Sequence, residues 1–257
     1  MSTESLSCHV GELTLRYWVS GSGPQNIVVL HGTASDHGTW DPVLAGLGEL
    51  GTVYAPDLRG HGFSGRASHY RFVDFVPDVI RFIEQSVRGP VLLIGHSSGG
   101  IVALNIAGNR PDLVTGVIAE EPPLFILDWF QESVWPQVFS DAVALAGNSV
   151  ESITESLVLQ GQDRSRALQR AFGLAHVDAK VFHPLLNLTM FDGYPTEAIL
   201  GNIACPTLIL HDFDAPGSGL RPPTLAKAMA ILSAAHVTHI AGAGHSIHSS
   251  NPGAFLN

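Results

Sequence analysis

Length, composition and charge narrow the protein to a compact, acidic, globular class. The chain has 257 residues, of which 45% are apolar and 14% charged; this excludes a disordered chain and is compatible with one large α/β domain. Its 13 Lys and Arg against 23 Asp and Glu give a net charge of −10 without a basic cluster, so we expect neither nucleic acid nor a membrane surface as a partner. No secretory signal or membrane-length apolar run is evident, and Cys8 and Cys205 are too few for a disulfide framework, so we expect a cytoplasmic protein.

Short apolar runs rich in β-branched residues alternate with helix-length segments along most of the chain. The first 20 residues alternate polar and apolar side chains around Gly11-Glu12, which is typical of a hairpin. Helix-length segments include 72–87 and 98–108. Because continuous apolar runs suit strands covered on both faces, the pattern predicts β–α–β units and a largely parallel sheet. The apolar runs lie at residues 27–30, 52–55, 91–94, 114–119, 207–210 and 236–241.

The alternation is interrupted once, from about Leu124 to Ala204, where the sequence reads as several amphipathic helices and no strand-like run occurs. We interpret this segment as a helical cap, residues 124–204, inserted into a core domain made of residues 1–123 and 205–257. Trp129 and Trp135 follow closely after the strand predicted at 114–119, where the cap must begin. We therefore expect these two side chains to contact substrate, although aromatic residues in such a segment more often serve packing.

The strongest chemical signal is the sequence Gly95-His96-Ser97-Ser98-Gly99, which directly follows a predicted strand and precedes a predicted helix. A sharp turn from strand to helix brings the residues two positions before and two positions after the serine against one another. Side chains there would clash, so both positions must be glycine. The turn also exposes the serine hydroxyl at a helix N-terminus, which favours developing negative charge. The sequence thus predicts Ser97 as a nucleophile.

A second signal lies after the predicted strand at 27–30, where His31-Gly32-Thr33 begins a loop. A serine that transfers an acyl group needs two backbone N–H groups aimed at the oxyanion of the tetrahedral intermediate. We expect one from Ser98, the residue after the nucleophile, and the other from Thr33.

These motifs resemble the α/β-hydrolase family, and the likeness continues into Pro56–Gly65 and covers nearly all of the chain outside the predicted cap. The resemblance implies a mostly parallel, eight-stranded sheet flanked by helices. It also implies that a catalytic histidine follows the last strand in a G-x-G-H setting, which is His245 in the segment 242–245. Only 12 residues follow His245, fewer than the closing helix of the family usually needs, so we expect that the C-terminus is trimmed.

The same resemblance allows two places for the acid that orients the histidine, and the sequence leaves both open. One is the loop after the strand at 207–210, where Asp214 fits if His211 replaces the usual glycine. The other is the end of the strand after the nucleophile helix, where Glu121 precedes a proline. A glutamate before proline, combined with a G-x-S-S-G elbow, resembles zearalenone-lactonase-like members, so we favour Glu121 over Asp214. Glu120, one residue away in a strand, is expected to point to the opposite face, as a surface or hydrogen-bonding residue.

These residues predict a serine hydrolase that cleaves a carboxylic ester or lactone, with an apolar substrate indicated by the aromatic cap. Ser97 would form the acyl-enzyme with His245 as general base, without a cofactor, and no histidine spacing indicates a metal site. Two alternatives stay open: a carbon–carbon-bond hydrolase of ring-cleavage products, and a catalytically weak small-molecule receptor on the same fold. The sequence leaves open the exact substrate and whether the chain forms a homo-oligomer.

Overall fold

An eight-stranded sheet forms the centre of the structure, a computed structural model that describes residues 4–215 and 217–257. The strand order is β1-β2-β4-β3-β5-β6-β7-β8. Strand β2 pairs in antiparallel fashion with β1 and with β4, whereas all other neighbours are parallel. The predicted mostly parallel, eight-stranded sheet is confirmed. The strands are β1 (Glu4–His9), β2 (Thr14–Ser20), β3 (Gln25–Leu30), β4 (Gly51–Pro56), β5 (Val91–His96), β6 (Val114–Glu120), β7 (Thr207–His211) and β8 (Ala235–His239).

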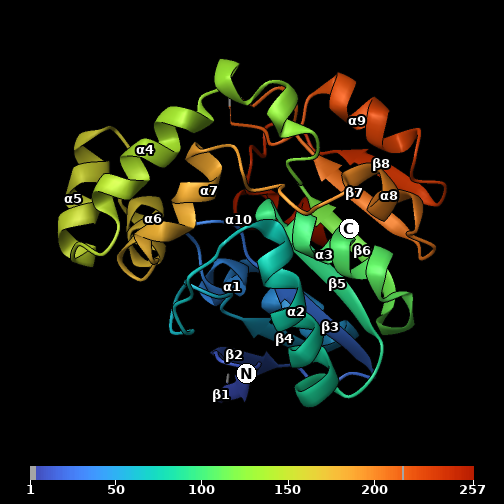
Figure 1. The fold of residues 1–257 in the computed structure, drawn as a ribbon. Coiled ribbons are helices and arrows are strands. Elements are labelled where there is room, and N and C mark those ends of the chain that lie inside the picture. Colours follow the sequence, from blue (N-terminus) through green and yellow to red (C-terminus); the bar gives the residue numbers. More distant parts are fainter. Residues whose placement is uncertain (1–3, 216) are drawn as a thin grey trace.

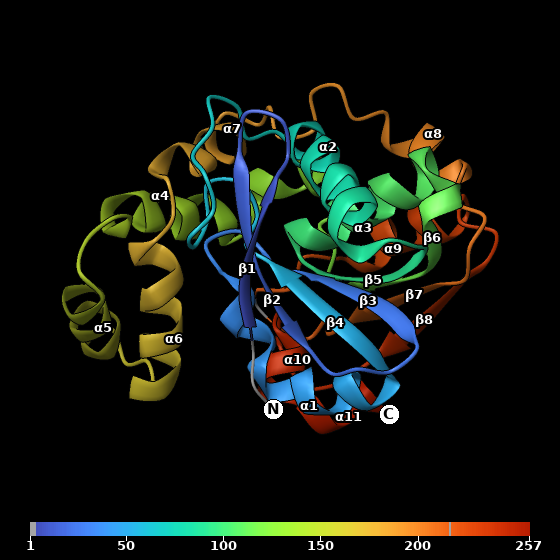
Figure 2. The same cartoon turned by 90° about the horizontal axis from the view of Figure 1, so that it is seen from below.

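Helices cover both faces of the sheet, as Figures 1 and 2 show. One face carries α1 (Asp41–Leu50), α10 (Ile247–Ser250) and α11 (Pro252–Leu256), which pack against one another. The other face carries α2 (Phe72–Phe82), which continues as the π-turn η2 (Ile83–Val87), and α3 (Ser98–Asn109). The remaining core elements are η1 (His37–Trp40), η3 (Pro111–Leu113) and α9 (Pro222–Met229). No helix in the described part of the chain has the length and apolar character needed to cross a membrane.

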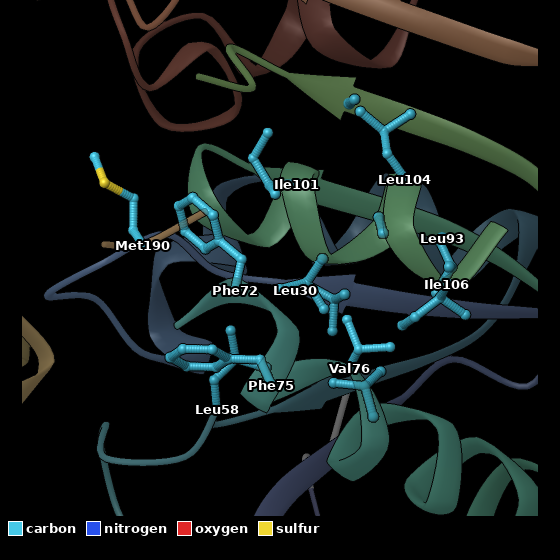
Figure 3. Close-up of a cluster of buried hydrophobic side chains, with 14 of the residues drawn as sticks. Leu30, Leu58, Phe72, Phe75, Val76, Leu93, Ile101, Leu104, Ile106 and Met190 are labelled. Carbon is cyan, nitrogen blue, oxygen red and sulfur yellow. The ribbon is translucent and has the colours of Figure 1, made fainter. Parts of the chain in front are cut away.

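The buried strand β3 shows why its residues form a continuous apolar run. Successive side chains of a strand point to opposite faces, so Val28 and Leu30 pack into the cluster under α2 and α3, while Ile27 and Val29 pack into a second cluster under α1. Figure 3 shows the first cluster, in which Leu30 lies among side chains of α2 and α3. Both faces of β3 are therefore buried from solvent, as in other parallel sheets with helices on each side.

The segment between β6 and β7 contains helices and turns but, in its described residues, no strand. Its helices α4 to α7 lie beside the sheet in Figure 1, and α5 packs along α6. Its last helix, α8, instead packs on α3, so closely that a Cβ on Gly108 would lie 2.4 Å from the carbonyl oxygen of Ile199. This part of the predicted cap range thus lies in the helix layer of the sheet. The elements are η4 (Ile126–Asp128), η5 (Phe130–Glu132), α4 (Trp135–Leu145), α5 (Val150–Leu159), α6 (Arg164–Ala175), η6 (Ala179–Phe182), α7 (His183–Leu186) and α8 (Thr196–Gly201).

The close approach of α3 to β3 generates a test of the packing. A Cβ on Gly99 would lie 2.2 Å from the carbonyl oxygen of Leu30 and 2.6 Å from that of His31, so backbone would have to move. We expect Gly99→Ala to lower the free energy of unfolding by about 3 kcal/mol, measured by urea denaturation. Gly253→Ala is the control, because nothing lies within 4 Å of its Cβ position, and its effect should stay within about 0.5 kcal/mol. Equal midpoints for the two variants would contradict the close contact.

Candidate active site

Ser97 occupies a strained turn between β5 and α3. Its backbone angles, φ 53° and ψ −121°, lie in a region that residues with a side chain rarely adopt. A Cβ on Gly95 would lie 2.3 Å from the carbonyl oxygen of Gly99, which confirms that the two glycines of the motif face one another. The backbone N–H of Ser97 donates to the carbonyl of Glu120 at 2.8 Å, so the turn is also tied to β6. This is the geometry of a nucleophile elbow.

The two predicted oxyanion-hole residues lie together beside Ser97. Thr33 Oγ1 donates to Ser98 Oγ at 3.1 Å, and both residues line one cavity together with Ser97. The loop of Thr33 approaches the elbow closely, since a Cβ on Gly32 would lie 3.1 Å from Ser97 Cβ. As the first residue of α3, Ser98 has a backbone N–H without an intrahelical acceptor. The arrangement can therefore present both N–H groups to an oxyanion.

His245 lies in the loop between β8 and α10 and lines the same cavities as Ser97. Its Nδ1 is 3.3 Å from Glu121 Oε2, slightly longer than an ordinary hydrogen bond. No hydrogen bond joins Ser97 Oγ to this ring in the described residues; such bonds are often long in unliganded sites and shorten when substrate binds. His96 fixes the loop, because its Nε2–H donates to the carbonyl of His245 at 2.9 Å. Burial holds the pKa of His96 well below its usual range, so it acts as a neutral donor.

The carboxylate of Glu121 is fully buried at the end of β6, with a left-handed φ of 49°. It accepts hydrogen bonds from the Asp212 N–H at 2.6 Å, from the Ser218 hydroxyl at 2.8 Å and from the Gly219 N–H, all in the loop after β7. These donors offset the cost of burying a charged group and aim one oxygen at His245. The structure thus brings Glu121, and not a residue of the β7 loop, to the histidine.

The alternative acid, Asp214, lies elsewhere. Its side chain is 81% exposed, and its carboxylate lies 3.6 Å from His239 rather than beside His245. The β7 loop does border the histidine loop, as expected for the usual location of the acid. The carboxylate that it contributes there is that of Asp212, whose Oδ2 accepts the Gly244 N–H at 2.8 Å and so holds the backbone next to His245. Asp214 is therefore a surface residue in this structure.

Glu120 forms a second, fully buried pair that the sequence did not single out. As expected for a strand, its side chain points to the face opposite Glu121, where His248 Nδ1 lies 2.7 Å from Glu120 Oε2. His248 Nε2 in turn lies 2.9 Å from Thr39 Oγ1. Of the two roles expected for Glu120, a surface residue or a hydrogen-bonding one, the structure shows the second. Two adjacent glutamates at a strand end, together with two histidines three residues apart, were the signal for this arrangement.

Two cavities share Ser97 and His245. The smaller, of about 20 Å³, is apolar and contains Phe72 and Met190, which Figure 3 places side by side. The larger, of about 390 Å³, has polar as well as apolar walls. Trp135 lines both cavities, and its ring centroid lies 4.8 Å from that of His245. Trp135 is therefore placed to contact a substrate.

Trp129, the other tryptophan expected to contact substrate, lines neither cavity. Its buried ring packs under the Arg221 guanidinium, whose central carbon lies 4.3 Å from the ring centroid. The expectation for Trp129 is corrected: it serves packing, because η4 and η5 turn the chain between Leu124 and Trp135 and direct the two indoles differently.

In two groups of three side chains, the possible ligand atoms lie close enough together to hold a metal ion. Their oxygens already accept hydrogen bonds: Asp57 from His37 at 2.8 Å and from Phe63 at 2.9 Å, and Asp212 from Gly244. No metal role is needed to explain either group. The groups are Asp36, His37 and Asp57, and Asp212, Asp214 and His239.

Buried histidines support the loop of Thr33. His31 Nε2 accepts the Leu58 N–H at 2.9 Å while its Nδ1–H donates to the Gly32 carbonyl at 2.8 Å, a pattern that requires the neutral ring. Burial lowers the pKa of His31, against a smaller opposing effect of Asp57. Burial, with a smaller contribution from His31, lowers the pKa of the neighbouring His61 to about 3.

This burial predicts acid sensitivity. Unfolded His61 binds a proton below about pH 6.5, whereas the folded ring stays neutral to about pH 3, so its stabilisation is complete above pH 6.5 and is lost as the pH falls. Between pH 7 and pH 5 it should account for about 2 kcal/mol of lost unfolding free energy. His61→Gln should remove that part of the pH dependence in urea denaturation, whereas the exposed control His236→Gln should retain it. An unchanged pH dependence in His61→Gln would contradict the assignment.

Comparisons with known proteins agree with this geometry. A family model described as "Alpha/beta hydrolase family" matches residues 27–257. The chain is 29% identical over 233 residues to the biotin biosynthesis bifunctional protein BioHC of Cellvibrio japonicus, covering 88% of this chain and 45% of that protein. It is 28% identical over 166 residues to the lipase LipV of Mycobacterium tuberculosis, covering 65% and 56% respectively, so it spans about half the length of these curated relatives. The crystal structure of E-2-(acetamidomethylene)succinate hydrolase shares the fold, with a TM-score of 0.81 and 21% identity over 99% of this chain and 97% of that one.

Proposed function

Because the chain belongs to the alpha/beta hydrolase family, we propose that it is a serine hydrolase that cleaves a carboxylic ester or lactone through an acyl-enzyme on Ser97. The observation that carries this proposal is the pairing of His245 with the buried Glu121 on a cavity that also contains the elbow serine. A nucleophile, a base and a group that orients the base are the minimal set for acyl transfer. The name of the lipase relative supports an ester as the substrate of this chain.

In the proposed mechanism, Ser97 Oγ attacks the carbonyl carbon while His245 accepts its proton. Glu121 stabilises the imidazolium that forms and holds Nδ1–H, so that Nε2 is the nitrogen available to the serine. The N–H groups of Thr33 and Ser98 stabilise the oxyanion. His245 then protonates the leaving alcohol and activates the water that hydrolyses the acyl-enzyme.

The smaller cavity supports an apolar group next to the reacting carbonyl. Its lining is apolar apart from Thr33, Ser97, Ser98 and His245. The Trp135 ring also lines it and packs edge to face against the His245 ring. The use of Glu121, rather than an acid after β7, supports the lactonase-like resemblance and keeps lactones among the proposed substrates. A receptor on the same fold would bind such molecules without turnover.

Loss of the nucleophile tests the central claim. Ser97→Ala should reduce turnover of a p-nitrophenyl ester on the order of 10⁶-fold, because the triad acts as a unit. Ser152→Ala, on the exposed face of α5, is the control and should retain wild-type turnover. Mass spectrometry of the wild type quenched during turnover should find the acyl group on Ser97. A wild type without turnover would favour the receptor, and a Ser97→Ala variant with a tenth of wild-type activity would contradict the proposed nucleophile.

The acid is tested by a matched pair of amide substitutions. Glu121→Gln should lower kcat by about 10⁴-fold, since an amide cannot balance the imidazolium charge and favours the wrong tautomer. Asp214→Asn should stay within about tenfold of wild type, because that side chain does not touch His245. Circular dichroism would establish that both variants are folded. The assignment fails if Asp214→Asn is the more damaging change.

A further inference from the structure

Helix α6 presents one polar face to the larger cavity. Arg166, Gln169 and Arg170 all line it, together with Ser97 and His245. Their spacing of three and four residues places them on the same side of a helix. The catalytic cavity is therefore bordered by two guanidinium groups, in a protein whose net charge is −10.

Neither guanidinium has a protein partner in the described chain. Among the described residues, no carboxylate oxygen lies within 4.0 Å of either guanidinium, and neither of these two side chains donates a hydrogen bond. Arg164 of the same helix, by contrast, binds Glu155 at 2.8 Å. Two arginines of α6 are thus left for a ligand, while the third is neutralised by the protein.

Two acidic groups act electrostatically on these arginines without contacting their guanidinium groups. Asp163 acts in this way on Arg166, while its carboxylate caps the N-terminus of α6 by accepting the backbone N–H groups of Ser165 and Arg166. Asp141 of α4 accepts a hydrogen bond from Gln137 at 2.7 Å and acts on Arg170 only from a distance. Although Arg170 keeps solvent-accessible atoms, the surrounding chain partly desolvates its guanidinium and lowers its pKa. A partly desolvated cation is stabilised by a bound anion.

We propose that the substrate carries a carboxylate, separate from the ester or lactone carbonyl, which Arg166 and Arg170 bind. This inference rests on the proposed function and names the substrate class for the same site. Guanidinium groups match a carboxylate with paired hydrogen bonds, and Gln169 of the same helix also lines this cavity. The smaller, mostly apolar cavity, which Ser97 also lines, then receives an uncharged part of the molecule. The substrate is thus amphipathic, with one apolar and one anionic end.

The test compares anionic esters with matched neutral ones. One pair is the p-nitrophenyl monoester of adipic acid and its methyl ester, which places the carboxylate on the acyl side. The other pair is 4-butanoyloxybenzoate and its methyl ester, which places it on the leaving group. For each pair, the ratio of kcat/KM for the anionic ester to that for the neutral ester is measured in wild type, in Arg166→Gln/Arg170→Gln and in Arg164→Gln.

We expect the ratio to fall about tenfold or more in the double variant for at least one pair, because two charge-assisted contacts are lost. The two esters of a pair differ in intrinsic reactivity, but this difference is the same for every protein. It therefore cancels when the kcat/KM ratio of a variant is compared with that of the wild type. Arg164→Gln removes the same kind of charge from the same helix, so an unchanged ratio there assigns the effect to the cavity. Ratios that are equal in all three proteins, for both pairs, would overturn the proposal and leave the serine-hydrolase function standing.

A binding measurement separates the two claims. If the wild type hydrolyses none of the four esters, the proposed function fails, and calorimetry on Ser97→Ala decides the carboxylate site by itself. Tighter binding of an anionic ester than of its methyl ester, lost when Arg166 and Arg170 are also changed to Gln, would support the site. Equal affinities would overturn it.

Discussion

The contact between α3 and the ends of β3 and β5 is the constraint on which the rest of the site depends. Gly95 and Gly99 allow backbone to meet backbone at distances that any Cβ would prevent. This approach forces the turn at Ser97 into its strained conformation and places the start of α3 beside the loop of Thr33. One steric requirement therefore positions Ser97, the N-terminus of α3 and the loop of Thr33 together. Strain of this kind persists because the surrounding core over-determines it.

Two buried glutamates, whose side chains point in opposite directions, hold the segment that brings His245 to Ser97. Glu121 contacts His245 in the loop between β8 and α10, and Glu120 contacts His248 within α10. Two adjacent glutamates thus hold two histidines that are three residues apart. A buried carboxylate needs several donors, and for Glu121 the loop after β7 supplies most of them. The loop after β7, which contains the alternative candidate Asp214, thus remains part of the site as a source of hydrogen bonds.

The helical segment between β6 and β7 adds two different properties to the cavities that Ser97 lines. Near Trp135 it provides apolar walls, and along α6 it provides two unneutralised arginines. The sheet and its loops hold the groups proposed for bond cleavage, whereas this segment holds the groups proposed for selecting the substrate. Such a division lets one fold serve many substrates while its reactive centre is retained.

The sequence by itself determined the features that have local causes. Strand runs, the glycines around Ser97 and the loop of Thr33 were predictable because each pattern follows from sterics or burial within a few residues. The choice between Glu121 and Asp214 was not, since both strand ends border the histidine loop and only the packed sheet aims one side chain inward. For the same reason Trp129 and Trp135 could not be separated: two turns decide which indole reaches the cavity. The arginines of α6 share a face by their spacing alone. Only tertiary packing decides that this face borders the cavity of Ser97 and that, among the described residues, no carboxylate pairs with the guanidinium groups of Arg166 and Arg170.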